Sequence, residues 1–363
     1  MRSLMVLPSY LPDVGGVAIH VAEVAPRLIK AGVAVEVLTT DRSGLLPKYE
    51  VINGVPVHRV ASYPKRRDYY FAPGLVPAMR RGRWDVVHCQ GVQSFVPPLA
   101  MLVAAGRQLP YIVTFHTGGH SSLIRTRLRT LQWLALVPLL RRAHRLIAVS
   151  GFEAQVFSGL PGVDASRISI ISNGAEAGRP NPSVTVDRDL IVSVGRLERY
   201  KGHQKVIEAL PELLTRRPHA HVRIAGDGSY ANELQALARR LGVATRVEIG
   251  AIPPSDRSGM ADLMARAGVV ALLSDYESQG LAVLEALALG RPVVVTDATA
   301  LHEFVLGGLA HGVPAQASPR EVAEAIVQGL ERPTRSSVRI PTWDDCAAQV
   351  LEVYRSIGSP AHF

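Results

Sequence analysis

SDYESQGLAVLEALALGRPVVV, residues 274–295, is the stretch that decides the fold. The apolar run just before it, residues 269–273, predicts a buried parallel strand. After a short polar turn, apolar residues recur at helical spacing over residues 281–289, and Gly290 ends that helix. Residues 293–295 begin the next strand. This order of strand, helix and strand predicts an α/β fold with a parallel sheet.

Two carboxylates lie in this apolar setting, Glu277 before the helix and Glu285 within it, with seven residues between them. The free amides at a helix start favour an oxygen-rich ligand, and a carboxylate beside them can accept hydrogen bonds from hydroxyls. Glu285 shares its helix face with Leu281 and Leu289, so it needs a polyol or a protein partner. The alternative is a pair of solvated glutamates on a surface helix.

This stretch resembles the Glu-x7-Glu motif of the family 4 retaining glycosyltransferases, which have the GT-B fold. The glutamate spacing and the Gly-x-Pro-Val-Val ending match, whereas Gln279 stands where the family usually has an aromatic residue. The resemblance implies that Glu277 meets the donor sugar and that Glu285 meets the ribose of the nucleotide. It also implies that the residues after the first glutamate bind sugar hydroxyls, namely Ser278, Gln279, Gly280 and Leu281. The departure at Gln279 bears on the identity of the sugar.

A second motif, Gly-Arg-Leu-x-x-x-Lys-Gly, follows a predicted strand at Leu190–Val194 and supplies Arg196 and Lys201. Two cations held by a turn can neutralise a diphosphate without a metal ion, Arg through a bidentate fork and Lys as a point charge. The family has this pattern at the same place. The resemblance further implies that Gly226 lies in a donor-side turn and that the turn at Ile252 pairs with the nucleobase.

The first half of the chain starts with a predicted strand at Leu4–Pro8, a loop containing Gly15 and Gly16, and a helix from about Ile19 to Ala31. A glycine pair between strand and helix lets the backbone approach a phosphate closely. The loop does not have the G-x-G-x-x-G pattern, so a dinucleotide-binding fold is not supported. A tight turn is the alternative, and the resemblance implies contact with the donor diphosphate.

His116 follows a predicted strand at Tyr111–Phe115, and open α/β sheets bind ligands at the carboxyl ends of their strands. The resemblance implies that His116 holds a sugar hydroxyl or stabilises the positive centre of the reaction. Further strands of this half are predicted at Val33–Leu38, Val55–Val60, Val86–Cys89, Arg145–Ser150 and Ile168–Gly174.

The charge is unevenly distributed along the chain. Residues 1–178 carry 20 Lys and Arg against 10 Asp and Glu, or +10, and the remainder carries 20 against 21, or −1. Six arginines between residues 125 and 145 are mixed with leucines and Trp133. This pattern predicts a partly basic amphipathic helix, broken near Pro138, that could rest on an anionic membrane surface. The alternative is a core helix with a solvated basic face.

Several classes of protein are disfavoured. The two cysteines, Cys89 and Cys346, lack metal-type spacing, which favours a reducing compartment over a disulfide framework. The first residues read as a strand and not as a signal peptide, and no apolar run reaches the roughly 20 residues of a spanning helix. The basic, aromatic loop 64–70 lacks any accompanying nucleic-acid motif. The triplet Asp187-Arg188-Asp189, placed in a linker before a strand, is interpreted as chance.

We therefore predict an α/β protein with two Rossmann-like, doubly wound domains facing across a cleft. The acceptor-side domain would comprise residues 1–178 with a C-terminal helix at about 343–358, and the nucleotide-sugar domain residues 185–340. The predicted enzyme is a cytoplasmic, retaining hexosyltransferase that needs no cofactor or metal and uses a UDP- or GDP-linked sugar. Arg196 and Lys201 would stabilise the departing diphosphate in a front-face substitution.

The predicted acceptor is lipid-linked or otherwise anionic, with peripheral attachment to the inner face of the membrane. The first alternative is a small soluble acceptor, such as a natural product or an osmolyte precursor. A nucleotide-sugar 2-epimerase and a non-catalytic sugar-nucleotide binder are less favoured. A phosphorylase would need the context of a pyridoxal phosphate lysine, which the sequence lacks.

Overall fold

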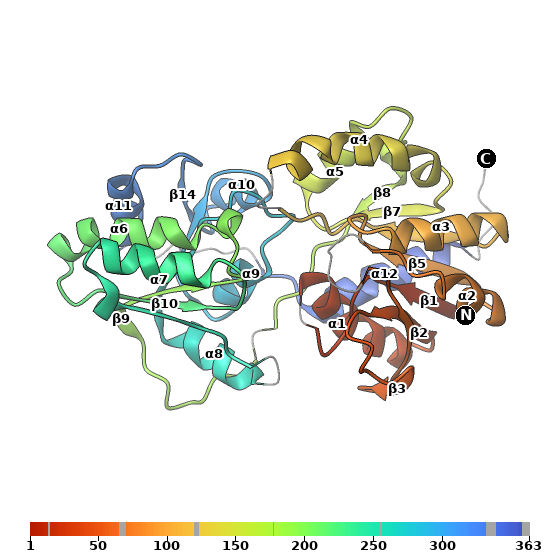
Figure 1. The fold of residues 1–363 in the computed structure, drawn as a ribbon, viewed down its shortest axis with the longest axis horizontal. Coiled ribbons are helices and arrows are strands. Elements are labelled where there is room, and N and C mark those ends of the chain that lie inside the picture. Colours follow the sequence, from red (N-terminus) through yellow and green to blue (C-terminus); the bar gives the residue numbers. More distant parts are fainter. Residues whose placement is uncertain are drawn as a thin grey trace. The chain divides into compact units, whose positions relative to one another are not determined.

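The computed structural model describes residues 1–13, 15–64, 70–119, 123–176, 178–253, 256–331 and 339–357, with the backbone alone over 123–130. Two compact units make up the chain (Figure 1). Unit 1 comprises Met1–Thr117, Arg127–Gly174 and Pro341–Phe363, and unit 2 comprises Gly118–Thr126 and Ala175–Ile340. Each unit is built around a sheet of its own.

The sheet of unit 1 has eight strands in the order β3-β4-β2-β1-β5-β6-β7-β8. Neighbouring strands are parallel, except that β3 runs antiparallel to β4 at one edge. The strands are β1 Arg2–Val6, β2 Ala34–Asp41, β3 Tyr49–Ile52, β4 Val55–Ala61, β5 Val86–Gln90, β6 Tyr111–Thr114, β7 Arg145–Ala148 and β8 Ile168–Ile170. The strand order reverses between β1 and β5, and ligands of such sheets bind at the carboxyl ends beside that point.

Helices cover both faces of this sheet. They are α1 Gly16–Lys30, α2 Leu75–Arg81, α3 Val96–Gly106, α4 Leu123–Leu140, α5 Gly151–Ser158 and α12 Trp343–Ile357. Side chains of α2, α3, α4 and α5 join alternate residues of β1, β5 and β6 in one apolar core. On the other face α1 contacts α12, and the hydroxyl of Tyr354 in α12 bonds Ser3 and His88 at 2.9 Å each. The last described helix therefore belongs to unit 1.

The sheet of unit 2 has six parallel strands in the order β11-β10-β9-β12-β13-β14. They are β9 Asp187–Val194, β10 His221–Ala225, β11 Val247–Gly250, β12 Ala267–Leu272, β13 Val293–Thr296 and β14 His311–Val313. All six residues of β12 are buried, as expected for a central parallel strand covered on both faces. The strand order reverses between β9 and β12, so the loops after these two strands are neighbours.

Two apolar cores hold the helices of unit 2 against its sheet, one on each face. The helices are α6 His203–Arg216, α7 Ala231–Arg240, α8 Arg257–Arg266, α9 Leu281–Ala288, α10 Leu301–Leu306 and α11 Pro319–Glu331. Residues of α6, α7 and α11 form the core on one face, and residues of α8, α9 and α10 form the core on the other. The prediction of two doubly wound α/β domains is confirmed for each unit by itself.

Two local features of unit 2 differ from what the sequence indicated. Helix α10, which begins at Leu301, was not predicted. The triplet Asp187-Arg188-Asp189 lies in β9 and not in a linker. Its carboxylates face cations, since Asp189 bonds Arg217 at 3.0 Å and Asp187 lies 3.4 Å from His221. Both carboxylates of the triplet therefore have ion-pair partners within unit 2. Among the described residues, no helix is both long and apolar enough to span a membrane.

Candidate active site

The loops after β9 and β12 form the centre of the candidate site in unit 2. The first contains Arg196 and a short 3-10 turn, Arg199–Lys201, and it ends at Gly202 with φ +75°. A Cβ atom on Gly202 would lie 1.9 Å from the carbonyl oxygen of Leu273 in the second loop. Only glycine allows the two backbones to approach this closely. The Lys-Gly pair of the motif thus brings Lys201 onto the loop that carries Glu277.

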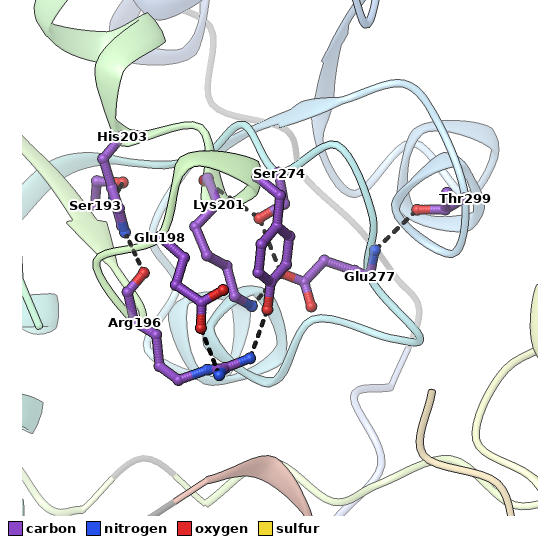
Figure 2. Close-up of polar contacts among 9 residues, drawn as sticks. Ser193, Arg196, Glu198, Lys201, His203, Ser274, Glu277 and Thr299 are labelled. Atoms are coloured by element: carbon purple, nitrogen blue, oxygen red, sulfur yellow. Dashed lines mark hydrogen bonds and ion pairs between the residues drawn. The ribbon is translucent and has the colours of Figure 1, made fainter. Parts of the chain in front are cut away.

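Lys201 and Glu277 form an ion pair between the two sequence motifs (Figure 2). Lys201 Nζ lies 2.6 Å from Glu277 Oε1, and the same oxygen accepts a bond of 2.8 Å from the Ser274 hydroxyl. The Glu277 amide donates to the hydroxyl of Thr299 at 3.1 Å, and Thr299 has a left-handed backbone with φ +53°. Within the described chain, Glu277 Oε2 has no hydrogen-bond partner. This oxygen is therefore the one that can accept a bond from a ligand hydroxyl.

The ion pair is largely shielded from water, with the Lys201 and Glu277 side chains 16% and 13% exposed. Burial opposes the charge on Lys201, but the Glu277 carboxylate and the Tyr200 hydroxyl together outweigh burial and raise the pKa of the amine above its ordinary value. Lys201 therefore stays cationic at physiological pH. A charged amine held at a shielded site acts more strongly on a nearby anion than one in bulk water.

Arg196 extends toward solvent beside this pair. Its guanidinium contacts Glu198 at 2.6 Å and the Tyr200 hydroxyl at 2.7 Å, and its side chain is 60% exposed. Its carbonyl oxygen lies 3.2 Å from Nε2 of His203, whose Nδ1 lies 2.9 Å from the Ser193 hydroxyl (Figure 2). Burial lowers the pKa of His203 to about 4, so this ring is neutral and holds the Arg196 backbone. Sequence reasoning did not identify this role of His203.

The turn at Gly226 is shaped by close backbone packing. A Cβ atom on Gly226 would lie 1.9 Å from the carbonyl oxygen of Gly195, so glycine is required there to fold the Arg196 loop. Ile252 is half-buried and lines a groove of about 710 Å³ beside β10, β11 and α8. The donor-binding roles expected of Gly226 and Ile252 stay predictions.

The start of α9 has the open amides that the sequence predicted. Gly280 is the N-cap residue, with φ +90° and no side-chain cap, and Leu281 is the first helical residue. Gln279 is buried, whereas Ser278 and Glu285 are partly exposed. The uncapped N–H groups and the helix dipole favour an anionic or oxygen-rich ligand here. The structure thus places residues 277–281 together at one edge of the unit 2 sheet.

His116 lies at the carboxyl edge of the unit 1 sheet, just after β6. Its backbone is left-handed, with φ +46°, and its Nε2 lies 2.9 Å from Oε1 of the Gln90 side chain. Burial, followed by His20 and His88, lowers the pKa of His116 well below 6.5, so the ring is neutral. A neutral imidazole can bind a sugar hydroxyl but adds no positive charge.

The glycine pair opens the first helix of unit 1. Gly15 is the N-cap of α1 with an extended backbone, φ −164°, and no side-chain cap, and Gly16 is the first helical residue. A Cβ atom on Gly15 would meet no atom within 4 Å. Glycine is therefore not required there by the fold, which is compatible with the space being used by a ligand.

Sequence reasoning missed two side chains near His116, those of His20 and Glu153. His20 in α1 bonds Asn173 at 2.7 Å, and its ring centroid lies 4.6 Å from that of His116. Glu153 in α5 accepts hydrogen bonds from Thr117, the residue after His116. The spacing Ser150-x-x-Glu153 is a capping-box signature that could have located the start of α5 and Glu153 with it.

The helix break predicted near Pro138 is absent, whereas the strand predicted from Arg145 is present. α4 continues through Pro138 to Leu140, and Arg145 is the first residue of β7. Trp133 is buried in the core against Phe157, so it is not available to a membrane. The side chains of Arg125, Arg127 and Arg129 lie outside the described residues.

The remaining arginines of the stretch gather at the amino-terminal edge of the unit 1 sheet. Arg142 and His144 line a groove of about 440 Å³ together with Arg167. Arg145 begins β7, whereas His116 follows the opposite end of the parallel neighbour β6. This basic cluster and His116 therefore lie at opposite edges of the sheet.

Comparison with protein families gives two matches that together span most of the chain. The family described as Glycosyltransferase Family 4 matches residues 14–179. The family described as Glycosyl transferases group 1 matches residues 176–340. The first contains the glycine pair and His116, and the second contains both motifs of unit 2.

Curated relatives match over nearly the whole chain. Glycogen synthase of Mycobacterium tuberculosis is 32% identical over 375 residues, covering 94% of this chain and 87% of that protein. D-inositol 3-phosphate glycosyltransferase 2 of Catenulispora acidiphila is 27% identical, covering 89% of this chain and 83% of that protein.

Solved structures with the same fold include two further proteins. Sucrose-phosphate synthase from Thermosynechococcus elongatus has a TM-score of 0.79 and 20% identity, covering 98% of both chains. The Anabaena protein HepE in complex with UDP-glucose has a TM-score of 0.73 and 20% identity, again covering 98% of both chains.

Proposed function

The chain belongs to the family 4 glycosyltransferases of the GT-B fold, and from this premise we propose that it transfers a sugar from a nucleotide diphosphate sugar with retention at the anomeric carbon. The observation that carries the proposal is the shielded ion pair of Lys201 and Glu277, which joins the two motifs at the strand-order reversal of unit 2. A cation for the diphosphate and a carboxylate for the sugar thereby lie side by side.

The donor would bind along the carboxyl edge of the unit 2 sheet. Lys201 and the exposed guanidinium of Arg196 would contact the diphosphate, and their charge would stabilise the departing nucleotide as its own charge grows. Glu277 Oε2 would accept a bond from a sugar hydroxyl, while the amides at the start of α9 would bind other oxygens. The UDP-glucose complex of the structural relative HepE supports UDP as the first nucleotide to try.

Two fixed cations take the place that a divalent metal ion has in other sugar transferases. We therefore propose that transfer needs neither a metal ion nor an organic cofactor. Activity after treatment with a chelator should equal that of untreated enzyme. Complete loss, restored by Mn²⁺ or Mg²⁺, would refute this part of the proposal.

The proposed acceptor is an anionic molecule with a free hydroxyl, either lipid-linked or soluble. The support is the +10 charge of residues 1–178 and the similarity to D-inositol 3-phosphate glycosyltransferases, whose name includes a phosphate-bearing acceptor. A lipid-linked acceptor would need the enzyme at the membrane surface, where each cation contributes about 1 kcal/mol. Arg141 and Arg142, which follow directly after α4, are the candidates for that attachment.

The main experiment incubates the protein with UDP- and GDP-sugars and with pools of anionic lipid or soluble acceptors, and analyses products by mass spectrometry and NMR. We expect a glycosylated acceptor that keeps the donor's anomeric configuration. An altered sugar nucleotide without acceptor would indicate an epimerase, and binding without turnover would indicate a non-catalytic binder.

Liposome sedimentation separates the two sources of acceptor. Binding should rise with anionic lipid content and should be lost when Arg141→Glu and Arg142→Glu are combined. If the wild-type protein does not sediment even at low salt, the acceptor is soluble and peripheral attachment is wrong.

A further inference from the structure

Glu153 is a fully buried carboxylate whose hydrogen bonds converge on the loop after β6. Its Oε1 accepts from the Thr117 amide at 2.7 Å and from the Thr117 hydroxyl at 2.8 Å. Its Oε2 accepts from the Val149 amide at 3.0 Å, and the His116 amide also donates to the carboxylate. All four groups are donors, which is the environment that an ionised, acceptor-only carboxylate requires.

The hydrogen bonds of the Glu153 carboxylate differ from those of an ordinary helix cap. The Ser150 hydroxyl accepts from the Glu153 amide at 3.1 Å, which is one half of a capping box at the start of α5. In a complete capping box the glutamate would reach back to the amide of Ser150. Here the carboxylate instead bonds Val149 and the separate loop at His116 and Thr117, so it serves that loop as well as α5.

The loop that Glu153 holds has an unusual backbone. His116 has φ +46°, a left-handed conformation that residues with a side chain adopt rarely and that surrounding contacts must maintain. The His116 amide and the next amide both donate to the Glu153 carboxylate. On its other side the His116 ring is held by Gln90, at 2.9 Å. The direction of the imidazole thus depends on a buried anion three elements away in the chain.

We infer that Glu153 is a positioning residue, which fixes His116 and Thr117 for the sugar or acceptor through charge-assisted bonds to their backbone. The inference rests on the proposed function for its effect on turnover, because His116 is the group expected to touch the substrate. Its effect on the geometry of His116 does not depend on which substrate is used.

The arrangement predicts a particular pH dependence. Burial raises the pKa of Glu153 to about 7, against the opposing hydrogen bonds from Thr117 and Val149. A protonated carboxyl offers fewer acceptor sites, so its hold on the loop weakens as the pH falls through about 7.

The other titratable groups around α5 do not change charge in this range. The pKa of His116 lies well below 6.5, and that of His20, which packs on it, is about 4, both chiefly through burial. Arg145 in β7 and Arg167, in a 3-10 turn against α5, contribute guanidinium groups nearby. Among these described groups, Glu153 is therefore the one that would account for a fall in turnover as the pH decreases through about 7.

The test compares Glu153→Gln with the wild-type protein and with Ser150→Ala. Glu153→Gln keeps the size of the side chain and one acceptor oxygen but removes the charge. We expect kcat to fall about ten- to a hundredfold, as displacement of a substrate-contacting group does, with the donor KM within about twofold. The acid limb of the pH–rate profile near 7 should disappear. Ser150→Ala removes the N-cap but no carboxylate bond, so it should lower Tm and leave the pH profile intact.

NMR of the His116 imidazole provides a readout that needs no turnover. In the wild-type protein this resonance should shift with a midpoint near pH 7, and in Glu153→Gln the shift should be absent. Thr117→Val removes one of the four donors to Glu153, so the pH-dependent shift of the His116 resonance should be smaller than in the wild type. This variant provides the test if Glu153→Gln does not fold. An unchanged His116 resonance and pH profile in Glu153→Gln would overturn the inference. A changed resonance in a protein that turns over no sugar nucleotide would support the positioning role and reject the proposed function.

Discussion

Replacement of Lys201 by methionine should affect folding and turnover by separable amounts. The substitution keeps most of the aliphatic stem but leaves the Glu277 carboxylate, which is 13% exposed, without its cation. The Ser274 hydroxyl still donates a hydrogen bond of 2.8 Å to Oε1 of Glu277. Removing one member of a buried ion pair costs about 3–5 kcal/mol, because the other charge stays buried and uncompensated.

The Ser274 bond remains, so we expect the lower end of that range, about 3 kcal/mol of unfolding free energy. For a unit of this size, such a loss lowers Tm by about 6–12 °C. The loss of a charge-assisted contact to the leaving diphosphate should cost a further ~2–4 kcal/mol in the transition state, or roughly 30- to 1000-fold in turnover. The ion pair seen in the structure therefore predicts that Lys201→Met also lowers the stability of unit 2, which the sequence alone did not suggest.

The double variant Lys201→Met with Glu277→Gln separates the two effects. Replacing a whole buried pair by neutral residues is often close to neutral for stability, so we expect unfolding free energy within about 1 kcal/mol of wild type. Turnover should stay as low as in Lys201→Met. All three tryptophans, Trp84, Trp133 and Trp343, belong to unit 1, so unfolding of unit 2 is best followed by circular dichroism in urea.

Two results would refute this reasoning. If the double variant regains both stability and wild-type turnover, Lys201 has a structural role only. If Lys201→Met alone unfolds at the same urea concentration as the wild type, the pair is not effectively buried.

Three further predictions follow from single sites. Gly15→Ala should leave Tm unchanged, because its Cβ meets no atom within 4 Å, but it should raise the donor KM if the start of α1 binds the diphosphate; an unchanged KM would argue against that contact. Gln279→Phe should change the ranking of donor sugars in competition assays, because the side chain beside the sugar is altered. The affinity for UDP, measured by calorimetry, should stay within about twofold. An identical ranking would show that this position does not select the sugar. Burial lowers the pKa of His20 to about 4 and that of His88 to about 3, below the 6.5 of the unfolded chain. The unfolded state therefore binds more protons as pH falls below 6.5, and His20 alone should remove about 3 kcal/mol of stability by pH 4; urea unfolding between those pH values checks this, and His88→Gln should flatten the slope.

The layout of unit 2 could be predicted because its strands are continuous apolar runs separated by glycine-containing turns. The same pattern placed Lys201 and Glu277 each in a loop at a strand's carboxyl end. It could not show that they form an ion pair, because that contact depends on the approach of Gly202 to Leu273 across neighbouring strands. Residues 76 apart in sequence meet only through the sheet order.

The elements that were missed are short or rely on features outside hydrophobic periodicity. β14 has three residues and α10 has six, too few for a periodic pattern to be visible. The hairpin of β3 and β4 turns at Asn53-Gly54, with φ +50° and +79°, and this dipeptide is itself a strong turn signal that would have located β3.

The prediction of a helix break at Pro138 was wrong for a physical reason. Pro138 lies on the exposed side of α4, where water can bond the carbonyl that loses its partner, so the helix continues to Leu140. The roles of the buried histidines and of Glu153 were equally hidden, since they depend on contacts between helices and loops far apart in the sequence.

The bonds of Tyr354 to Ser3 and His88 have a consequence for how the protein is made. Unit 2 is an insertion between the eighth strand of unit 1 and α12, the helix that covers part of the unit 1 sheet. On the ribosome, β1 emerges more than 330 residues before α12, the helix that covers it. Unit 2 can complete its sheet before α12 is synthesised. Unit 1 cannot complete its fold until then, and His88 and the neighbouring strands stay exposed to solvent on that face. We therefore expect a chaperone that binds nascent chains to bind mainly to unit 1 and not to unit 2.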